Sequence, residues 1–437
     1  MRIITDIDEA RALLTRRPAY AEPVLPPAVA KRTAEIFGET LTATEAVRRI
    51  LADVREGGDE AVRDYALRID GAEPADLEVP RTHWKAALDQ LPTDLVGALL
   101  TAAARIRAYH EASMPRSWQD DAAGYGERIL PIERVGLYVP GGTAEYPSTV
   151  LMSAVPAKVA GVPEVVLCTP APSAATLAAA HVAGVDRLFA VGGAQAIAAM
   201  AYGTESIPRV DKVCGPGNVF VSIAKREVYG DVDIDGLYGP TETVVIADET
   251  ADPALAAADL LAQAEHDELA SPILITTSAA VAELVSAEVE RQLAGLERRR
   301  IASAALEGRG MAVVVDSVEQ AVELANAYAP EHLCLLVRDA ESYVDSVSSA
   351  GGLFLGEHSP EVLGDYVAGP SHVMPTGGTA RFASSLGVHT FLRRMPVVGL
   401  SEATLKEIGP AAAALARTEG LTAHARAVEM RLEGEAR

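Results

Sequence analysis

The chain has 437 residues, of which 49% are hydrophobic, so it is long enough for two or three domains with packed cores. Its 61 acidic residues against 38 Lys and Arg give a net charge of -23, which disfavours binding to nucleic acid or anionic membranes. No apolar run approaches the ~20 residues of a membrane span, and the first twenty residues lack an apolar signal core. We therefore expect a globular, cytoplasmic protein.

The three cysteines, Cys168, Cys214 and Cys334, form no C-x-x-C pair, which argues against a disulfide scaffold and a thiolate zinc cage. A reactive thiol could oxidise an aldehyde through a covalent intermediate. Each cysteine, however, ends or lies within a strand-like apolar run, so we interpret all three as small buried hydrophobes. Any zinc here would then need nitrogen and oxygen ligands.

The first 133 residues are predicted to be mainly helical, and an alternation of strands and helices begins at residue 134. Strand patterns lie at residues 134–139, 164–168, 187–191, 210–214 and 232–234. Helical patterns lie between them at residues 149–160, 173–183, 194–201 and 218–229. The repeating unit is βα, which predicts a doubly wound parallel sheet.

A second α/β region begins with a strand at 243–247 and a helix for which Asp252 is the N-cap and Pro253 the first residue. Further strands are predicted at 273–276, 311–315, 333–337 and 352–355, with helices at 318–327 and 340–349. Glycine and proline crowd residues 357–380, which predicts little regular structure and suits a functional loop. From about residue 384 the chain reads as helices, including 410–417 and 422–433.

Three predicted strands of the first region run into glycine at their carboxyl ends, at residues 140–142, 192–193 and 215–218. Ligands of parallel sheets gather at such ends, where glycine lets the backbone approach a phosphate and a helix N-terminus stabilises its charge. None of these loops reads G-x-G-x-x-G, and tight βα turns alone would also explain the glycines. Tyr138, Gln195 and Asn218 lie at or just after strand ends, where they could contact a cofactor or cap the loops.

Gln263 and His266 lie three residues apart near the end of a predicted helix, a spacing that places both side chains on one face. Such a pair can supply two ligands to a metal ion, which needs further ligands from elsewhere. Taken singly, each of the nine histidines is more often a structural residue than a ligand. His358 and His389 lie in no setting comparable to those of the other candidates, and we interpret them as surface residues.

Glu331 and His332 stand at the start of a predicted strand, where a carboxylate and an imidazole suit general-base and proton-relay chemistry. The remaining candidates are Asp365 and His372, in the glycine-rich segment, and His424, which follows Glu419 by five residues on a late helix.

Eight short motifs occur in a fixed order along the chain. They are LYVPGG at 137–142, VGGAQA at 191–196, GPGN at 215–218, GPTE at 239–242, QAEH at 263–266, PEH at 330–332, GDY at 364–366 and LTAH at 421–424. Together these motifs resemble the histidinol dehydrogenase family over nearly the whole chain. Their order and number make a coincidental match very improbable.

The resemblance implies a zinc site whose ligands are Gln263, His266, Asp365 and His424. The last of these would come from the partner subunit of a homodimer. The resemblance also implies that Glu331 and His332 perform the acid-base chemistry of an NAD-dependent oxidation of L-histidinol to L-histidine, the last steps of histidine biosynthesis.

The same resemblance implies the residues that bind substrate and cofactor. Thr241, His372 and Glu419 would hold the substrate together with His332 and the zinc ligands, and Tyr138, Gln195 and Asn218 would contact NAD. Thr241 departs from the family, which usually has serine there, but it keeps the hydroxyl.

The implied fold is α/β, with two Rossmann-like, doubly wound parallel-sheet domains and additional N- and C-terminal helical segments. Residues 1–133 would contribute to the first domain, and residues 134–236 would form its NAD-associated part. Residues 237–383 would form the second domain with the zinc and catalytic residues, and residues 384–437 a helical segment that reaches the partner subunit.

Three other functions compete with this interpretation. A related alcohol dehydrogenase could keep the zinc and the acid-base pair but oxidise another small primary alcohol, although His372 and Glu419 match histidinol-contacting positions. A zinc hydrolase could use a Glu-His pair but would need no glycine loops at three strand ends. A non-catalytic nucleotide-binding module would leave the clustered histidines and carboxylates unexplained.

Overall fold

The protein is described from a computed structural model, which covers residues 1–15, 25–71, 76–141 and 145–434. Gly142 of the first glycine loop therefore lies outside the described residues. The chain divides into two compact units, described separately below: unit 1 comprises Met1–Ser113 and Ile132–Phe391, and unit 2 comprises Met114–Pro131 and Leu392–Arg437. In the described ranges no helix is long and apolar enough to cross a membrane.

The first sheet of unit 1 is parallel throughout, with the strand order β6-β5-β4-β7-β8. Its strands are β4 (Arg134–Tyr138), β5 (Glu164–Cys168), β6 (Arg187–Phe189), β7 (Lys212–Cys214) and β8 (Asp233–Ile234). The helices that connect them are α6 (Pro147–Val159), α7 (Ala174–Ala183), α8 (Gly193–Tyr202) and α9 (Val219–Val228). Counted along the chain the strands lie in the order 3-2-1-4-5, which is that of a dinucleotide-binding fold.

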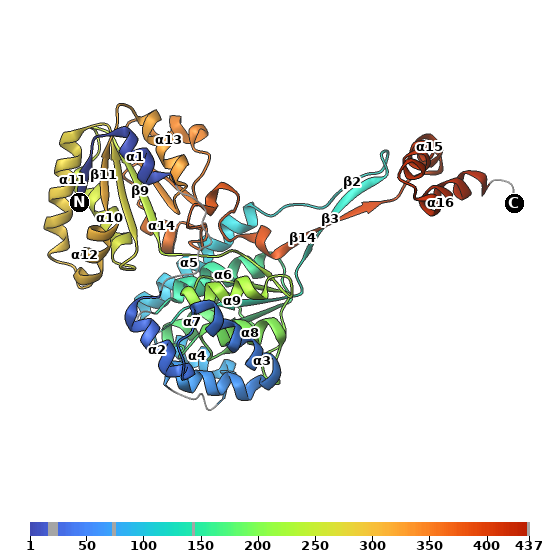
Figure 1. The fold of residues 1–437 in the computed structure, drawn as a ribbon, viewed down its shortest axis with the longest axis horizontal. Helices are drawn as coiled ribbons and strands as arrows, with labels where there is room; N and C mark the ends of the chain where they lie inside the picture. Colours follow the sequence, from blue (N-terminus) through green and yellow to red (C-terminus); the bar gives the residue numbers. More distant parts are fainter. Residues whose placement is uncertain (16–24, 72–75, 142–144, 435–437) are drawn as a thin grey trace. The chain divides into compact units, whose positions relative to one another are not determined.

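Helices cover both faces of this sheet, so its central strands are apolar on both sides (Figure 1). Val165, Val166 and Leu167 of β5 are 0% exposed. Fully burying such a side chain stabilises a fold by about 1.5–3 kcal/mol. The helices that precede the sheet in sequence are α2 (Pro27–Phe37), α3 (Ala43–Tyr65), the π-helix η1 (Ala66–Asp70), α4 (Arg81–Gln90) and α5 (Thr93–Ala112).

Helix α8 shows how composition shapes this packing. Residues 194–201 of α8 are all buried, and five of these eight are alanine. Small side chains let neighbouring elements approach on every side, and α3 packs directly against α8 and α9. A capping box begins α3, in which Thr42 accepts from the amide of Glu45 and Glu45 accepts from the amide of Thr42.

The second sheet of unit 1 is also parallel, with the order β1-β11-β10-β9-β12-β13. Its strands are β1 (Arg2–Ile4), β9 (Glu242–Ala247), β10 (Ser271–Thr276), β11 (Met311–Val314), β12 (His332–Leu336) and β13 (Gly352–Leu355). Around it lie α1 (Ile7–Leu14), α10 (Pro253–Ala264), α11 (Ala279–Leu293), α12 (Arg299–Gly308), α13 (Val318–Tyr328), α14 (Glu361–Tyr366) and the 3-10 helices η2 (Ala340–Ser346) and η3 (Thr379–Arg381). The 3-10 helix η4 (Val388–Phe391) packs against α6, beside the first sheet. From β9 to β13 the order is again 3-2-1-4-5, so the prediction of two doubly wound parallel sheets is confirmed.

Two parts of unit 1 differ from the prediction. β1 pairs with β11 and buries Ile4 in the second core, whereas the N-terminal region was expected to contribute to the first α/β domain. Three residues are too few to show a strand's alternation in the sequence. The glycine-rich segment forms the short helix α14 after Pro360, and the predicted helix at 340–349 is the 3-10 helix η2.

Unit 2 contains an antiparallel sheet, β14-β3-β2, and two helices. Its elements are β2 (Trp118–Asp120), β3 (Tyr125–Pro131), β14 (Leu392–Val398), α15 (Glu402–Thr418) and α16 (Thr422–Glu433). The two helices lie against each other where Gly409 of α15 faces Val428 and Leu432 of α16. The helices were predicted, but β14 corrects the expectation that residues from 384 onward are helical. As an edge strand β14 tolerates Pro396, a residue that obscures a strand in the sequence.

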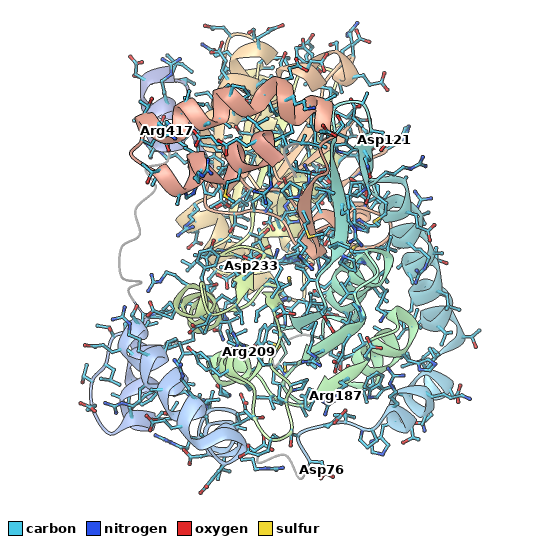
Figure 2. The ribbon with its side chains drawn as sticks, turned by 90° about the vertical axis from the view of Figure 1, so that its right-hand side faces the viewer. Asp76, Asp121, Arg187, Arg209, Asp233 and Arg417 are labelled. Atoms are coloured by element: carbon cyan, nitrogen blue, oxygen red, sulfur yellow. The ribbon has the colours of Figure 1, made fainter. Side chains whose placement is uncertain are left out.

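Charged side chains of different elements pair at the surface, as at Arg187, which Figure 2 labels. Arg187 of β6 binds Glu78 through two nitrogens, at 2.9 and 2.5 Å, and also donates to the carbonyl of Ser206. Pairs that stay partly in contact with solvent contribute on the order of 1 kcal/mol or less each. The three cysteines are buried and free, as predicted.

Candidate functional site

The site in the second sheet lies at the amino ends of two neighbouring strands. β9 and β12 pair in parallel, with His332 opposite Thr243, and they flank the point where the strand order reverses. Thr241 immediately precedes β9, and Glu331 immediately precedes β12. The register therefore brings a hydroxyl, a carboxylate and an imidazole together from residues 90 positions apart.

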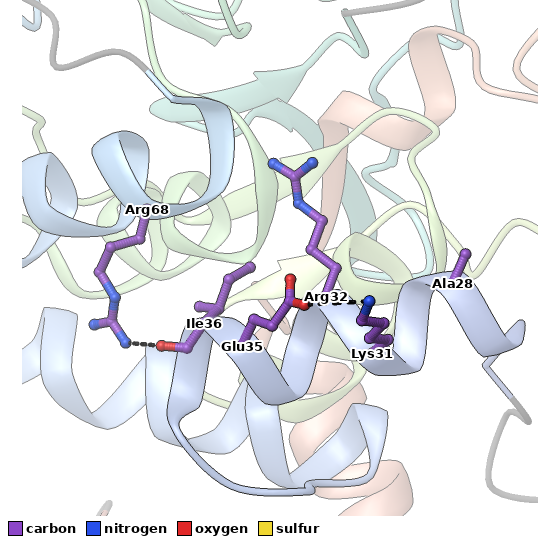
Figure 3. A pocket seen from close by; sticks show the side chains of 6 residues that line it. All are labelled: Ala28, Lys31, Arg32, Glu35, Ile36 and Arg68. Carbon is purple, nitrogen blue, oxygen red and sulfur yellow. Dashed lines mark hydrogen bonds and ion pairs between the residues drawn. The ribbon is translucent and has the colours of Figure 1, made fainter.

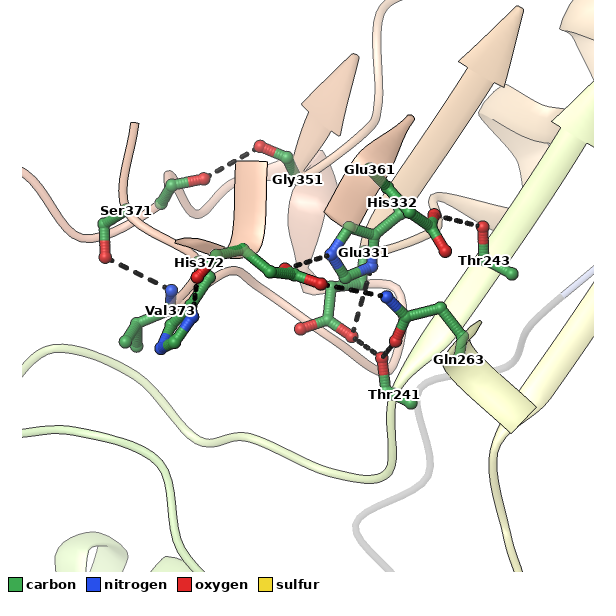
Figure 4. A network of polar contacts seen from close by, with 12 residues as sticks. Thr241, Thr243, Gln263, Glu331, His332, Gly351, Glu361, Ser371, His372 and Val373 are labelled. Atoms are coloured by element: carbon green, nitrogen blue, oxygen red, sulfur yellow. Dashed lines mark hydrogen bonds and ion pairs between the residues drawn. The ribbon is translucent and has the colours of Figure 1, made fainter. Parts of the chain in front are cut away.

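Thr241 joins two of these groups to helix α10. Its Oγ1 lies 2.8 Å from Gln263 Oε1 and 2.6 Å from Glu331 Oε2 (Figure 4). One hydroxyl proton can be donated to only one of two acceptors at a time. A proton on Glu331 would make both contacts hydrogen bonds, and burial of this carboxyl raises its pKa.

His332 is held on both sides of its ring. Nδ1 is 3.3 Å from the carbonyl oxygen of Glu242, and Nε2 is 3.4 Å from Oδ1 of Asp365. Phe354 stacks on the ring with centroids 5.9 Å apart. The side chain of His332 is 3% exposed, so the imidazole is nearly removed from water.

Asp365 closes these contacts into a ring. Its Oδ2 accepts from Nε2 of Gln263 at 3.4 Å, and its Oδ1 faces His332. The contacts run from Gln263 to Thr241 and from Thr241 to Glu331. An oxygen of Glu331 lies 3.7 Å from Nδ1 of His332, and Asp365 links His332 back to Gln263. Two of the predicted zinc ligands and the predicted acid-base pair thus share one continuous network.

Charge and burial act in opposite directions on this network. Burial lowers the pKa of His332, but the neighbouring Glu331 and Asp365 carboxylates outweigh that effect and raise the pKa above its usual value. Burial would raise the pKa of Asp365, but the hydrogen bond and charge of His332 outweigh it and lower the pKa. In this arrangement the imidazole and the aspartate stabilise each other as an ion pair.

The predicted zinc ligands are brought together in part. Gln263 and Asp365 are in contact, and His266 is close enough for the Asp365 charge to oppose the desolvation that lowers the pKa of His266. His424 lies in unit 2, in the first turn of α16. Among the described residues no group of three or more His, Cys, Asp or Glu forms a metal-holding cluster. The three residues in unit 1 nevertheless offer amide, imidazole and carboxylate donors, which is a nitrogen and oxygen set that suits zinc.

The helix that carries Gln263 is shorter than the sequence predicts. α10 ends at Ala264 with Glu265 as its C-cap, so His266 lies beyond the helix rather than on one of its faces. The amide of His266 donates to the carbonyl of Gln263 at 3.1 Å, which tightens the last turn.

His372 has both ring nitrogens engaged within the protein. Nδ1 lies 2.8 Å from the carbonyl oxygen of Asp365, and Nε2 lies 3.0 Å from the hydroxyl of Thr149 in α6. It therefore ties the backbone of Asp365 to the helical layer of the first sheet. Glu419, the C-cap of α15, lies in unit 2.

Two buried glutamates belong to the site but were not singled out in the sequence. The backbone of Glu242 contacts both members of the acid-base pair, since its amide donates to Glu331 and its carbonyl faces His332. Glu361, which is 0% exposed, accepts from the hydroxyl of Thr243 at 2.6 Å, and burial raises its pKa to about 7. Glu242 was adjacent to a predicted residue, whereas nothing in the sequence around Glu361 marks it.

The three predicted NAD contacts lie at the carboxyl edge of the first sheet. Tyr138 is 3% exposed, and its hydroxyl accepts from the amide of Gly193 at 3.1 Å, which joins the ends of β4 and the α8 loop. Gln195 is 0% exposed, and within the described part of the chain neither its amide oxygen nor its nitrogen has a partner. Asn218 caps α9 by accepting from the amides of Phe220 and Val221.

A surface cavity of about 460 Å³ lies elsewhere, over α2 and η1. Its lining residues are Ala28, Lys31, Arg32, Glu35, Ile36 and Arg68 (Figure 3). Their charges are already engaged in part, since Arg68 donates to the carbonyl of Ile36 and Lys31 lies 3.8 Å from Glu35. None of the predicted site residues lines this cavity.

A buried Glu-His pair at the second sheet, together with glycine loops at the strand ends of the parallel first sheet, is typical of an α/β enzyme. The sequence profile described as histidinol dehydrogenase matches residues 37–432. The chain belongs to the histidinol dehydrogenase family, and it is an oxidoreductase with a role in histidine biosynthesis.

Individual relatives support this assignment over nearly the full length. The chain is 51% identical to the histidinol dehydrogenase of Deinococcus radiodurans over 434 residues, which covers 97% of this chain and 98% of the relative. It is 53% identical to that of Thermus thermophilus over 393 residues, covering 89% and 95%. The crystal structure of histidinol dehydrogenase from Elizabethkingia anophelis matches with a TM-score of 0.90 and 35% identity, covering 100% of this chain and 98% of that one.

Proposed function

We propose that this protein oxidises L-histidinol to L-histidine through L-histidinal, passing two hydrides to two molecules of NAD, as a zinc-dependent homodimer. One observation carries the proposal. The ring of contacts joins the predicted zinc ligands Gln263 and Asp365 to the predicted acid-base pair Glu331 and His332. A substrate held at those ligands would therefore lie within reach of both acid-base groups.

The donors available in unit 1 support a zinc site made of Gln263, His266 and Asp365, with His424 of a second subunit as the fourth ligand. Zinc bound there would hold the imidazole and amine nitrogens of histidinol and would offset the Asp365 charge that favours a protonated His332.

In the first oxidation, His332 removes the hydroxyl proton of the alcohol as hydride leaves the same carbon for the nicotinamide. The fixed ring supports this role, because contacts to Glu242 and Asp365 restrict its rotation. An imidazole held in one orientation transfers a proton along one direction, which is what a positioned general base requires.

In the second oxidation, Glu331 accepts a proton from water as the water adds to the aldehyde, giving the hydrated form from which the second hydride leaves. Burial favours the neutral form of Glu331, while the charge of His332 and the amide of Glu242 favour the carboxylate. These opposing effects suit a group that must both take up and release a proton near neutral pH. The water route needs no thiol, in keeping with three buried cysteines whose pKa values are raised by burial.

NAD is proposed to bind at the carboxyl edge of the first sheet, against Tyr138, Gln195 and Asn218. This edge flanks the strand-order reversal between β4 and β7, where such sheets bind dinucleotides. Only six residues separate Ile234 at the end of β8 from Thr241 before β9. This short connection supports a position of the proposed NAD site close to the proposed acid-base residues. Thr241, His372 and Glu419 are proposed to hold the substrate.

Unit 2 supports the proposed homodimer. Val398, Leu415 and Met430 are 70%, 66% and 58% exposed in a unit of only two helices and a small sheet. A partner subunit would remove these apolar side chains from water. Light scattering on a sizing column should give twice the chain mass, and a monomer at the concentrations used for activity would contradict the homodimer.

The function is tested by NADH formation from L-histidinol, compared with a panel of other small primary alcohols and repeated after dialysis against a zinc chelator. We expect two NADH per histidinol, no turnover after chelation and recovery with added zinc. NADH formation from another alcohol but not from histidinol would contradict the proposed substrate.

The anchoring role of zinc is tested with His266→Asn, using His389→Asn as a control because His389 is an exposed histidine of η4. We expect the first variant to lose bound zinc by elemental analysis and to bind histidinol more weakly by calorimetry. Loss of zinc with unchanged histidinol affinity would contradict anchoring.

A further inference from the structure

A lysine and an aspartate of the first sheet are buried almost completely beside a glycine loop. Lys225 lies in α9, Asp235 follows β8, and each side chain is 1% exposed. Nζ of the lysine is 2.5 Å from Oδ1 of the aspartate. A buried ion pair adds little net stability, because lost hydration offsets the attraction. Its presence therefore points to a role in fixing local structure.

The pair binds both polar backbone groups of one residue, Gly215. Nζ of Lys225 donates to the Gly215 carbonyl at 2.8 Å, and Oδ2 of Asp235 accepts from the Gly215 amide at 2.7 Å. Gly215 is the first residue after β7 and begins the turn 215–218. Two buried side chains of opposite charge thus fix the peptide groups at the exit of this strand.

Gly215 has a conformation that depends on such support. Its φ is +113°, which residues with side chains rarely adopt, and a Cβ there would lie 2.1 Å from the carbonyl oxygen of Tyr138. The ends of β4 and β7 therefore meet backbone to backbone. This is the strand-order reversal at which the proposed function locates NAD.

The pair of Lys225 and Asp235 also lies beside the segment that leads to the second sheet. The Lys225 ammonium lies 4.7 Å from the centre of the Tyr238 ring, and Ser222 of α9 donates to the Tyr238 carbonyl at 2.9 Å. Tyr238 lies three residues before Thr241. One buried cation thus contacts both the glycine turn and the connection between the sheets.

We propose that Lys225 and Asp235 are positioning residues for the dinucleotide. They hold Gly215 so that the turn 215–218 leaves the sheet in the direction that presents Asn218 to NAD. The inference rests on the proposed function. It assigns a role in NAD affinity to two residues that themselves stay buried behind the loop.

The test is the double variant Lys225→Met/Asp235→Leu, which removes both charges together and leaves apolar side chains of similar size. We expect an unchanged circular dichroism spectrum, a KM for NAD raised roughly tenfold, and a KM for histidinol within about twofold of the native value. Direct NADH binding, followed by its fluorescence without histidinol, should weaken by the same factor. An unchanged KM for NAD in the folded double variant would overturn the proposal.

A second variant keeps the test decisive if the double variant does not fold. Asp235→Asn retains an oxygen for the Gly215 amide but removes the charge that pairs with Lys225, so we expect a rise of about threefold in the KM for NAD. An unchanged value in this variant would likewise overturn the proposal.

The chain offers a control pair at the amino ends of strands in the same sheet, with side chains that are 25% and 27% exposed. Lys158 and Asp186 lie 2.9 Å apart and also bind backbone, the carbonyl of Val162 and the amide of Val165 before and within β5. Lys158→Met/Asp186→Leu should leave the KM for NAD unchanged, and an equal rise there would show a general packing effect and overturn the specific role. Failure of the native protein to reduce NAD with histidinol would instead contradict the proposed function.

Discussion

Five strands of each parallel sheet of unit 1 follow the same order, but the candidate residues lie at opposite ends of the strands. In the first sheet the candidate residues lie at carboxyl ends, where glycine turns and helix N-termini dominate. In the second sheet they lie at amino ends, where carboxylates and an imidazole gather beside β9 and β12. Strand order therefore indicates where a sheet can bind a ligand, but the side chains decide which edge carries chemistry.

The buried histidines beside the two sheets also have different surroundings. His110 of α5 is 1% exposed, within the described residues neither of its ring nitrogens has a partner, and burial lowers its pKa to about 4. His332 is equally buried, but neighbouring carboxylates raise its pKa. Burial alone thus marks a packed residue, whereas burial among carboxylates marks a candidate for proton transfer.

The largest expected effect comes from the imidazole of the second sheet. His332→Asn should lower kcat by about 10²–10⁴-fold, because the variant lacks the proposed general base for the alcohol proton. NADH formation measures kcat, while zinc content and NADH affinity should stay near native values. Equal activity in the variant would remove His332 from the chemistry, and His389→Asn serves as the control.

The hydroxyl of Thr241 should come next. Thr241→Val leaves Glu331 and Gln263 without their shared partner, and an unsatisfied buried group costs about 1–3 kcal/mol, or roughly 5- to 150-fold in kcat/KM. Thr241→Ser keeps the hydroxyl and should remain within about twofold. If serine and valine reduced kcat/KM equally, the methyl group rather than the hydroxyl would matter.

At the carboxyl edge of the first sheet the effect should fall on cofactor affinity. Gln195→Leu removes a buried amide that lacks an internal partner, so the KM for NAD should rise about tenfold while zinc content stays the same. The measurement is the KM for each substrate in the variant. A change confined to the KM for histidinol would contradict the proposed binding of NAD at this edge.

The smallest effect concerns stability and should arise in the helical layer of the first sheet. Because the folded pKa of His110 lies below its unfolded value near 6.5, its contribution is present above pH 6.5 and is lost as pH falls towards 4. Native protein should lose about 1–3 kcal/mol over this window relative to His110→Leu. Urea unfolding at several pH values gives the two slopes, and parallel slopes would contradict the assignment.

Much of the fold could be predicted from the sequence, because long apolar runs and helix caps such as Asp252 report local structure directly. β1 and β14 could not, since pairing with β11 and β3 depends on distant partners and both strands lack a clear alternating pattern. Within the site, motifs identified Glu331 and Asp365. The buried carboxyl of Glu361, whose position depends on contact with Thr243, has no local signal.

One network at the second sheet is proposed to support two oxidations with distinct groups, and the variant Glu331→Gln separates the two roles. Native protein should yield two NADH per histidinol, whereas the variant should release one NADH and accumulate histidinal, which an aldehyde-trapping reagent would detect. Two NADH per histidinol from the variant, at the native rate, would contradict the division of roles between Glu331 and His332.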